Sequence, residues 1–211
     1  MNLDIEKKFW NQYNTVAGLD EVGRGPLAGP VVTACVVLKK NLKLTPEFIS
    51  LIKDSKKISE KRRQEIFNLI KENKDIVYTI DIQSNKIIDT DKNILKTTLN
   101  SFKNCIFKLK NIPDLVLIDG NQIIPDIDIS QKSIIQGDSK VFSIALASII
   151  AKVTRDNIVI KYTDIYPEYG FEKHKGYGTK QHIDAILKYG VQDVHRKTYA
   201  PIKNMLKKNK F

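Results

Sequence analysis

The sequence predicts an α/β domain in which helices cover a sheet of mixed strand direction. Three observations support this prediction: β-branched apolar runs joined by a glycine-rich turn, a long helical period, and a short apolar run after that helix. A turn joins antiparallel strands, whereas a strand that follows a helix is reached by a crossover. The order of these patterns therefore predicts both kinds of connection in one fold.

The first strands form an expected antiparallel meander. Val16–Leu19 is apolar and leads through Asp20-Glu21 into a glycine-rich turn at Gly23–Gly29. Val31–Leu38 is rich in β-branched residues, and Ile76–Ile82 alternates between apolar and polar residues. Both patterns are typical of strands.

The middle of the chain changes to a helical period. Five apolar residues recur at steps of 4, 3, 4 and 3 and would share one face of a helix: Leu95, Leu99, Phe102, Ile106 and Leu109. Pro113 ends this pattern, and Leu115–Ile118 then predicts a buried strand reached by a crossover. A further short strand is expected at Ser133–Gln136.

Three more helices are expected, and each has a recognisable boundary. Ser and Thr at a helix N-terminus cap free backbone N–H groups, and glycine favours a C-terminus. The expected helices run from a cap at Ser59 to about Asn73, from Phe142 to Ile160, and from a cap at Thr179 to before Gly190. The basic residues 203–211 are expected to form a frayed tail.

The composition is that of a globular protein without a membrane segment. Hydrophobic residues make up 42% and charged residues 28% of the chain. No run approaches the ~18 apolar residues of a membrane span, and the first residues lack a signal-peptide core. Cys35 and Cys105 lie among apolar residues and predict buried, reduced thiols. A cytoplasmic protein is therefore expected.

The charge is strongly basic and unevenly distributed. The formal net charge is +11, and residues 139–211 carry 14 Lys and Arg against 6 Asp and Glu. A basic surface favours a polyanion such as nucleic acid, because its phosphates release counterions when Lys or Arg neutralises them. The alternative is a solvated lysine-rich surface that reflects compositional bias alone.

Four acids stand out in this basic chain. Asp20, Glu21, Asp119 and Asp138 each follow or end an apolar run near glycine. If those runs are neighbouring strands, the carboxylates gather and repel one another unless a cation lies among them. Carboxylate oxygens suit Mg²⁺ or Mn²⁺, and two such ions ~4 Å apart hydrolyse phosphodiesters.

Two alternatives remain open from spacing alone. Aspartate beside glycine is also ordinary turn chemistry, which would leave the acids scattered. In addition, adjacent residues of a regular strand face opposite sides. Asp20 and Glu21 would therefore serve one site only if the strand twists or ends there.

The segment AGLDEVGRGPLAGPVV at Ala17–Val32 resembles the N-terminal signature of bacterial ribonuclease HII. Further motifs follow in that family's order over about residues 14–202: Asp54-Ser55-Lys56, Ile118-Asp119-Gly120-Asn121, Gly137-Asp138-Ser139-Lys140, SIIAKVTRD, KHKGYGT and HRKTYAP. The related ribonuclease HIII family usually has another residue in place of Arg24 and an extra N-terminal domain. Ribonuclease HII is therefore the better resemblance.

The resemblance implies a ribonuclease H-like fold, with a five-stranded mixed sheet, flanking helices and additional C-terminal helices. Residues 1–211 would form one catalytic domain. In that family four carboxylates bind Mn²⁺ or Mg²⁺ and are required for cleavage, and they match Asp20, Glu21, Asp119 and Asp138. The family does not use a zinc site, and the spacing of the three histidines does not suggest one.

The resemblance also implies the substrate. The family cleaves the RNA strand of RNA–DNA hybrids and incises duplex DNA on the 5′ side of a single embedded ribonucleotide, leaving 3′-hydroxyl and 5′-phosphate ends. The Gly23, Arg24 and Gly25 backbone would read the 2′-hydroxyl, and the Tyr177 ring would lie against the adjacent sugar. Without the family, Tyr177 would be interpreted as a packed loop aromatic.

Phosphate contacts are expected from several polar motifs. Ser55 and Lys56 match the phosphate-contacting segment of the family. Additional expected contacts are Ser139, Lys140, Ser148, Lys152, His174, Lys175 and Arg196. For each lysine, a solvated surface charge is the alternative.

The expected partners are nucleic acids alone. The C-terminal KNMLKKNKF lacks the paired aromatics of a sliding-clamp-binding peptide, and a monomer without a membrane partner is expected. Two other functions stay open: a non-catalytic nucleic-acid-binding protein on the same fold, or a different nuclease of that fold.

Overall fold

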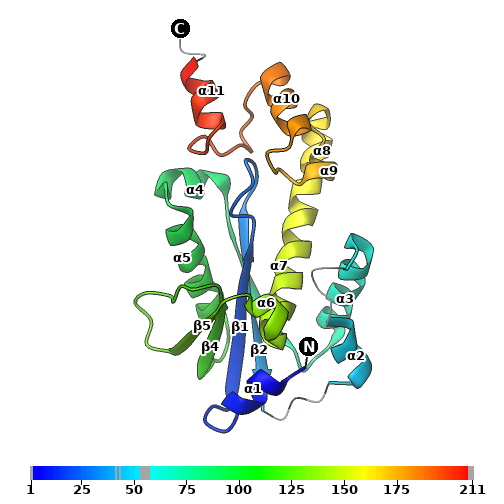
Figure 1. Cartoon of the computed structure of the whole chain (residues 1–211), viewed down its shortest axis with the longest axis vertical. Helices are drawn as coiled ribbons and strands as arrows, with labels where there is room; N and C mark the ends of the chain where they lie inside the picture. Colours follow the sequence, from blue (N-terminus) through cyan, green and yellow to red (C-terminus); the bar gives the residue numbers. More distant parts are fainter. Residues whose placement is uncertain (1, 41, 43, 53–57, 209–211) are drawn as a thin grey trace.

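A five-stranded sheet with strand order β3-β2-β1-β4-β5 forms the centre of the protein (Figure 1). This computed structural model describes residues 2–40, 42, 44–52 and 58–208. The strands are β1 Thr15–Val22, β2 Val31–Lys39, β3 Val77–Gln83, β4 Leu115–Asp119 and β5 Ser130–Ile134.

The sheet is mixed, as predicted. β1 pairs with β2, and β2 with β3, in antiparallel direction, whereas β4 runs parallel to both β1 and β5. The expected strand at Ser133–Gln136 is displaced, because β5 begins at Ser130 and ends at Ile134. β5 is an edge strand of polar composition, so no apolar run marks its start, and Gln136 ends the extended chain with a φ of 58°.

Two helices, α4 and α5, make the crossover from β3 to β4. They are α4 Asn85–Asp91 and α5 Ile94–Phe107. The break falls at Lys92, whose φ of 52° is left-handed, and Asn93 then caps α5 by accepting the N–H of Lys96 at 3.1 Å. The helical period therefore located α5 correctly, and a capped interruption separates it from α4.

Helices α5 and α7 cover opposite faces of the sheet (Figure 1). α7, Phe142–Ile160, has the bounds predicted from the sequence and packs on β1 and β2. Gly18 allows this close contact, because a Cβ there would lie 2.3 Å from the backbone carbon of Ser143. Ala145, Ala147 and Ala151 are fully buried along the helix. Small side chains thus bring α7 directly against the strand that carries Asp20.

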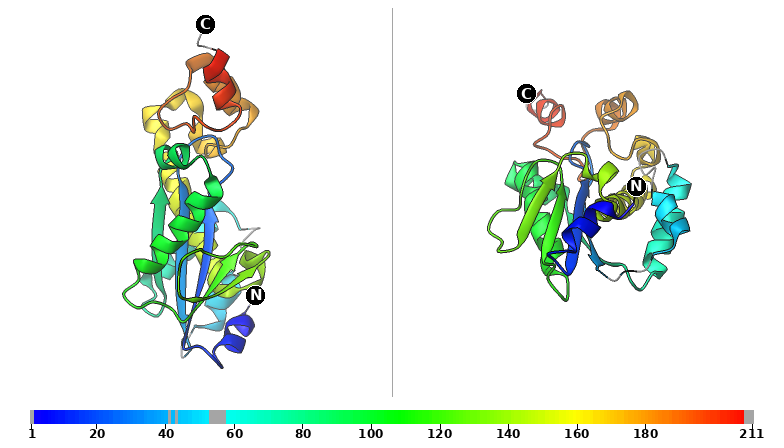
Figure 2. Two further views of the ribbon diagram at one scale, coloured as in Figure 1. Left: turned by 90° about the vertical axis from the view of Figure 1, so that its left-hand side faces the viewer. Right: turned by 60° about the horizontal axis from the view of Figure 1, so that its bottom comes forward.

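The remaining helices surround this centre (Figures 1 and 2). Their bounds are α1 Asp4–Phe9, α2 Pro46–Ile52, α3 Glu60–Glu72, α6 Gly137–Lys140, α8 Tyr162–Ile165, the 3₁₀ helix η1 Pro167–Tyr169, α9 Phe171–His174, α10 Lys180–Tyr189 and α11 Ile202–Lys208.

The predicted caps are present. The Ser59 hydroxyl accepts the N–H of Arg62 at 3.2 Å, and the Thr179 hydroxyl accepts the N–H of His182 at 3.3 Å. The prediction of a frayed tail is wrong for residues 203–208, which belong to α11. Fully buried Ile202 anchors that helix in the apolar cluster of the C-terminal region.

The two cysteines are buried free thiols, as predicted. Burial raises the pKa of the Cys35 thiol well above its usual value and that of Cys105 to about 11. Both therefore remain protonated near neutral pH.

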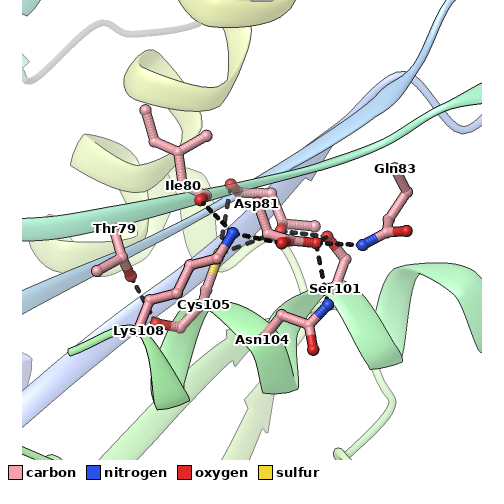
Figure 3. A network of polar contacts seen from close by, with 9 residues as sticks. Thr79, Ile80, Asp81, Gln83, Ser101, Asn104, Cys105 and Lys108 are labelled. Atoms are coloured by element: carbon pink, nitrogen blue, oxygen red, sulfur yellow. Dashed lines mark hydrogen bonds and ion pairs between the residues drawn. The ribbon is translucent and has the colours of Figure 1, made fainter.

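A buried polar network joins α5 to β2 and β3 (Figure 3). Asp81 of β3 lies opposite Thr33 of β2, and the Ser101 hydroxyl of α5 donates to Asp81 at 2.7 Å. Because the Ser101 hydrogen is used there, Thr33 donates to Ser101 across their 2.7 Å contact. Burial alone would raise the pKa of Asp81, but hydrogen bonds led by that of Lys108 hold it below its usual value.

Ser101→Ala is expected to lower the free energy of unfolding by about 1–3 kcal/mol, because Thr33 and Asp81 each lose a buried partner. Urea unfolding would measure this loss. Asn100→Ala, on the exposed side of the same helix, is the matched control and should change stability by less than about 0.5 kcal/mol. Equal effects of the two substitutions would contradict the network's role.

Candidate active site

The acids gather where β1 and β4 separate. The last pair of this parallel ladder is Leu19 with Ile118, so Asp20 and Asp119 are the next residues of their strands. β1 continues to Val22 beside β2 alone, whereas β4 ends at Asp119. Side chains at the carboxyl ends of parallel strands face the crevice in which α/β proteins bind ligands.

Asp20 and Glu21 point to opposite faces of β1, because the strand stays regular through both residues. Asp20 is 5% exposed, and Ser148 of α7 lies near it. Glu21 lines a pocket on the α5 side with Arg24 and Asp119. The negative charge of Asp119 disfavours ionisation of both carboxyls. Asp119, at the end of β4, is therefore close to side chains on both faces of β1.

Burial and mutual repulsion favour protons or a cation at these acids. Burial, followed by the charge of Glu21, raises the pKa of Asp20 well above 3.8. Burial also raises the pKa of Glu21 to about 7, against the opposing effect of Arg24, whose guanidinium lies 3.4 Å away. A divalent cation would stabilise the ionised form of both groups.

Asp119 is oriented by the segment that carries Asp138. Its Oδ1 accepts the N–H of Gly137 at 2.6 Å and that of Asp138 at 3.4 Å. A Cβ on Gly137 would lie 2.6 Å from Ile144 and 3.2 Å from Asp119 Oδ1. Glycine therefore lets α6 approach β4, and it brings the backbone of Asp138 next to Asp119.

The donor set fits a hard divalent cation. Asp20, Glu21, Asp119 and Asp138 offer only carboxylate oxygens, the ligands that Mg²⁺ and Mn²⁺ prefer. In the described part of the chain, no three His, Cys, Asp or Glu side chains are already arranged as a chelating group. The fit therefore rests on the oxygen chemistry and on the raised pKa values of Asp20 and Glu21.

The turn between β1 and β2 lies beside this crevice. Gly23 has a φ of 105°, and a Cβ there would lie 2.3 Å from Arg155 Nε. Arg24 and Gly25 are exposed. The 43%-exposed Tyr177 lies over the turn, because a Cβ on Gly25 would be 4.0 Å from its ring.

Comparisons with known proteins identify the family. A family model for ribonuclease HII matches residues 17–202. The chain is 52% identical to a ribonuclease HII of Clostridioides difficile over 98% of this chain and 77% of that protein, and 50% identical to one of Mycoplasma capricolum over 98% and 96%. The chain belongs to the ribonuclease HII family.

The activity and the fold follow from membership of this family. Ribonuclease HII is an endonuclease that cleaves RNA in RNA–DNA hybrids, and divalent metals are typical of ribonucleases H. The ribonuclease H2 of Pyrococcus horikoshii shares the fold, with a TM-score of 0.78 at 24% identity over 93% of this chain and 100% of that one. A ribonuclease HIII solved with Mn²⁺ has a TM-score of 0.68 at 17% identity and covers 93% and 70%. None of the helices in the described part of this ribonuclease HII is long and apolar enough to cross a membrane.

Two expected phosphate contacts are buried inside this ribonuclease HII. Arg196 is fully buried and donates to the carbonyls of Gly23, Arg24 and Gly29 at 2.6–3.0 Å. His174 is 7% exposed and bonded to backbone groups. Burial leaves these two side chains without surface for a phosphate, so their placement corrects that expectation.

The other expected contacts are placed as follows. Ser139 and Lys140 are exposed at α6, and Ser148 lies near Asp20. Lys152 pairs with Asp156 at 2.9 Å, and Lys175 lies 3.5 Å from Glu60. Ser55 and Lys56 lie outside the described residues.

The sequence analysis missed the supporting role of Arg155. This fully buried guanidinium lies on α7 and bonds three backbone carbonyls near the turn. A signal was present, because Arg155 lies four residues from each of two buried apolar residues, Ala151 and Val159. That spacing places a charged residue on the buried face of a helix.

Three histidines form a buried stack beneath the Tyr177 loop. The rings of His174 and His182 are 4.3 Å apart, and Nε2 of His182 lies 3.1 Å from Nε2 of His195. Nδ1 of His195 accepts the N–H of Gln192, so its Nε2–H donates to His182, whose Nδ1–H donates to Tyr177 O. Each ring thus needs an acceptor nitrogen, which only the neutral form has.

The stack predicts a pH dependence of stability. Burial lowers the pKa values of His182 and His195 from 6.5 to about 4, so both take up protons on unfolding between these values. Their contribution therefore falls as pH drops through this window, by up to ~1.4 kcal/mol per pH unit for each residue.

His182→Phe should make the free energy of unfolding less sensitive to pH between about 4 and 6.5 than in the wild type. Urea unfolding across that range would measure both proteins. The buried acids titrate in the same range with the opposite sign, but they are common to both proteins and cancel in the difference. Parallel pH curves would contradict the assigned neutral stack.

Proposed function

We propose that this ribonuclease HII also incises duplex DNA on the 5′ side of a single embedded ribonucleotide, leaving 3′-hydroxyl and 5′-phosphate ends. The observation that carries the proposal is the position of the acids at the end of β4, directly beside an exposed glycine turn. Cleavage chemistry and a backbone able to approach a ribose are thereby adjacent. We also propose that the protein is a cytoplasmic monomer and acts without a sliding clamp. By contrast, a ribonuclease HII of Archaeoglobus fulgidus has been solved in complex with PCNA.

Asp20, Glu21, Asp119 and Asp138 would hold Mn²⁺ or Mg²⁺ in this proposal. When bound, such a cation supplies an activated water and stabilises the charge on the leaving oxygen of the phosphodiester. Backbone N–H groups hold the Asp119 carboxylate in place, and Ser148 lies near Asp20. Arg24 balances part of the negative charge at Glu21.

The turn would distinguish RNA from DNA through the 2′-hydroxyl. Gly23 and Gly25 lack a Cβ, so the backbone there can approach a ribose closely. The Arg24 carbonyl already accepts from Arg196 and from the Tyr199 hydroxyl, so the turn is held in one shape. The Tyr177 ring would lie against the next sugar and combine stacking with a hydroxyl.

Phosphates on either side would be held by the polar surface around the crevice. Two exposed residues, Ser139 and Lys140, suit this role. So do two partly buried lysines, Lys152 and Lys175. Ser55 and Lys56 remain proposed contacts. The basic C-terminal part of the chain would accelerate association with a polyanion.

The wild-type protein with Mn²⁺ or Mg²⁺ should nick a duplex that contains one ribonucleotide and leave an all-DNA duplex of the same sequence intact. Gel analysis with mapped ends would measure both. Binding without a product would support a non-catalytic protein. Equal cutting of the all-DNA duplex would support a different nuclease of this fold.

Asp119→Asn should lower the cleavage rate by about 100-fold or more while binding of the hybrid persists, because a metal ligand loses its charge. Single-turnover cleavage and a gel-shift assay would separate the two effects. Asp128→Asn, at an exposed position of the loop between β4 and β5, is the matched control and should cleave at the wild-type rate. Wild-type cleavage by Asp119→Asn would exclude Asp119 as a ligand.

Tyr177→Ala should weaken cleavage at a single embedded ribonucleotide by about tenfold, since base or sugar stacking contributes ~1–3 kcal/mol. The ratio kcat/KM on that duplex would be measured. Tyr189→Ala is a control of equal exposure, 43%, at the end of α10. Equal ratios for the two variants would make Tyr177 a packing residue.

A further inference from the structure

Arg155 bridges two segments that lie far apart in the sequence. Its Nε donates to Pro30 O at 3.0 Å and its Nη2 to Ala28 O at 3.1 Å, both in the turn between β1 and β2. Its Nη1 donates to Lys175 O at 3.0 Å, two residues before Tyr177. One planar guanidinium therefore touches both proposed reading segments.

The guanidinium also limits the space beneath these segments. Its Cζ lies 5.9 Å from the centre of the Tyr177 ring. On the other side, a Cβ on Gly23 would be 2.3 Å from Arg155 Nε, so this glycine is required next to the arginine. The same side chain is thus in contact range of the tyrosine and of the glycine that begins the turn.

Arg196 provides an informative contrast. It is equally buried, but its side-chain bonds go to Gly23, Arg24 and Gly29 and its guanidinium lies over Tyr199. Arg196 therefore holds the shape of the turn itself, whereas Arg155 joins the turn to the Tyr177 loop. One direct backbone bond, from Leu27 N–H to Gly176 O at 2.8 Å, also spans this junction.

A fork of donors is needed for this junction. The three carbonyls are reached from three different nitrogens of one plane, which an ammonium group at a single point does not reproduce. Burial of a charged guanidinium costs desolvation free energy. The hydrogen bonds to all three carbonyls offset this cost. An apolar residue of similar volume would fill the space without setting the separation of the two segments.

We propose that Arg155 is a positioning residue that fixes the separation between the turn and Tyr177, and thereby sets the preference for a single ribonucleotide followed by deoxyribonucleotides. This inference rests on the proposed function, in which the turn reads one sugar and Tyr177 lies against the next. A 2′-hydroxyl on that next sugar adds an oxygen where the ring lies. Discrimination between the two substrates therefore depends on the spacing that Arg155 maintains.

Arg155→Lys tests the inference through a ratio of activities. The wild type and the variant would be assayed for kcat and KM on a duplex with one ribonucleotide and on an RNA–DNA hybrid of the same sequence. We expect the ratio of kcat/KM, embedded over hybrid, to fall about tenfold, since misplacement by ~1 Å costs up to ~100-fold. The dissociation constant for Mn²⁺ should stay within about twofold of the wild-type value.

Arg62→Lys is the matched control, because it makes the same substitution at an exposed ion pair with Glu65. It should leave the ratio unchanged. An Arg155→Lys ratio equal to that of Arg62→Lys would overturn the inference, and so would an equal loss on both substrates. A wild type inactive on the embedded ribonucleotide would refute the proposed function instead, and this inference with it.

A double-mutant cycle separates positioning from general stability. If Arg155 acts through Tyr177, then Arg155→Lys combined with Tyr177→Ala should show the same ratio as Tyr177→Ala alone. Two fold-changes that multiply would mean that Arg155 acts independently of the tyrosine, which would overturn the inference.

A spectroscopic measurement covers the case in which Arg155→Lys fails to fold. In ¹⁵N-labelled Asp119→Asn protein, the Arg155 Nε–H signal should shift on titration with the one-ribonucleotide duplex and stay in place with the all-DNA duplex. An identical response to both duplexes would overturn the inference.

Discussion

The parallel ladder of β1 and β4 stops at Leu19 and Ile118, and the candidate active site depends on this end point. Beyond it, β4 ends one residue later at Asp119, while β1 continues beside β2 to Val22. Asp119 therefore stands at the end of a strand with access to both faces of its neighbour. If β4 paired with β1 for one more residue, β4 would lie beside the part of β1 that carries Asp20 and Glu21. It would then separate their two carboxylates, which lie on opposite faces of β1.

The turn that follows β1 depends on support from outside the sheet. Eight residues separate β1 from β2 and form no ladder with each other, so their carbonyls need other donors. Arg155 and Arg196 supply most of these donors from their side chains, and the segment before α11 adds backbone bonds to Leu27 and Gly29. Arg155 of α7 and Arg196 of the segment before α11 therefore hold a turn that lies 125 to 173 residues earlier in the chain.

The sequence was sufficient for elements with a strong local signal. α7 is rich in apolar and small residues, and Ser59 and Thr179 cap their helices as expected. The predicted strand at Ser133–Gln136 began too late in the chain. The start of β5 has no apolar run, because an edge strand exposes polar side chains. The interruption at Lys92 was not foreseen, because its left-handed conformation gives no apolar signal.

For the candidate site too, some features could be predicted from the sequence and others could not. Carboxylates at the ends of apolar runs are visible in a sequence, so the proximity of Asp20, Glu21 and Asp119 could be predicted from it. The partners of Arg155 and Arg196 are backbone carbonyls, which carry no residue identity and therefore leave no pattern. The sharing of one site by Asp20 and Glu21 depends on where β4 ends, which follows from the pairing of distant strands.

Helix α7 carries Ser148, Lys152 and Arg155 at steps of 4 and 3, a spacing that places them along one face. The first of these lies near Asp20, and the last contacts the turn and the Tyr177 loop. Seven residues of α-helix rise by about 10 Å. In the proposed reaction, the distance from the phosphate that is cut to the ribose that is read is therefore set by the rise of a rigid helix. Two turns of regular backbone hydrogen bonds, instead of a loop, would determine which bond of the substrate is broken.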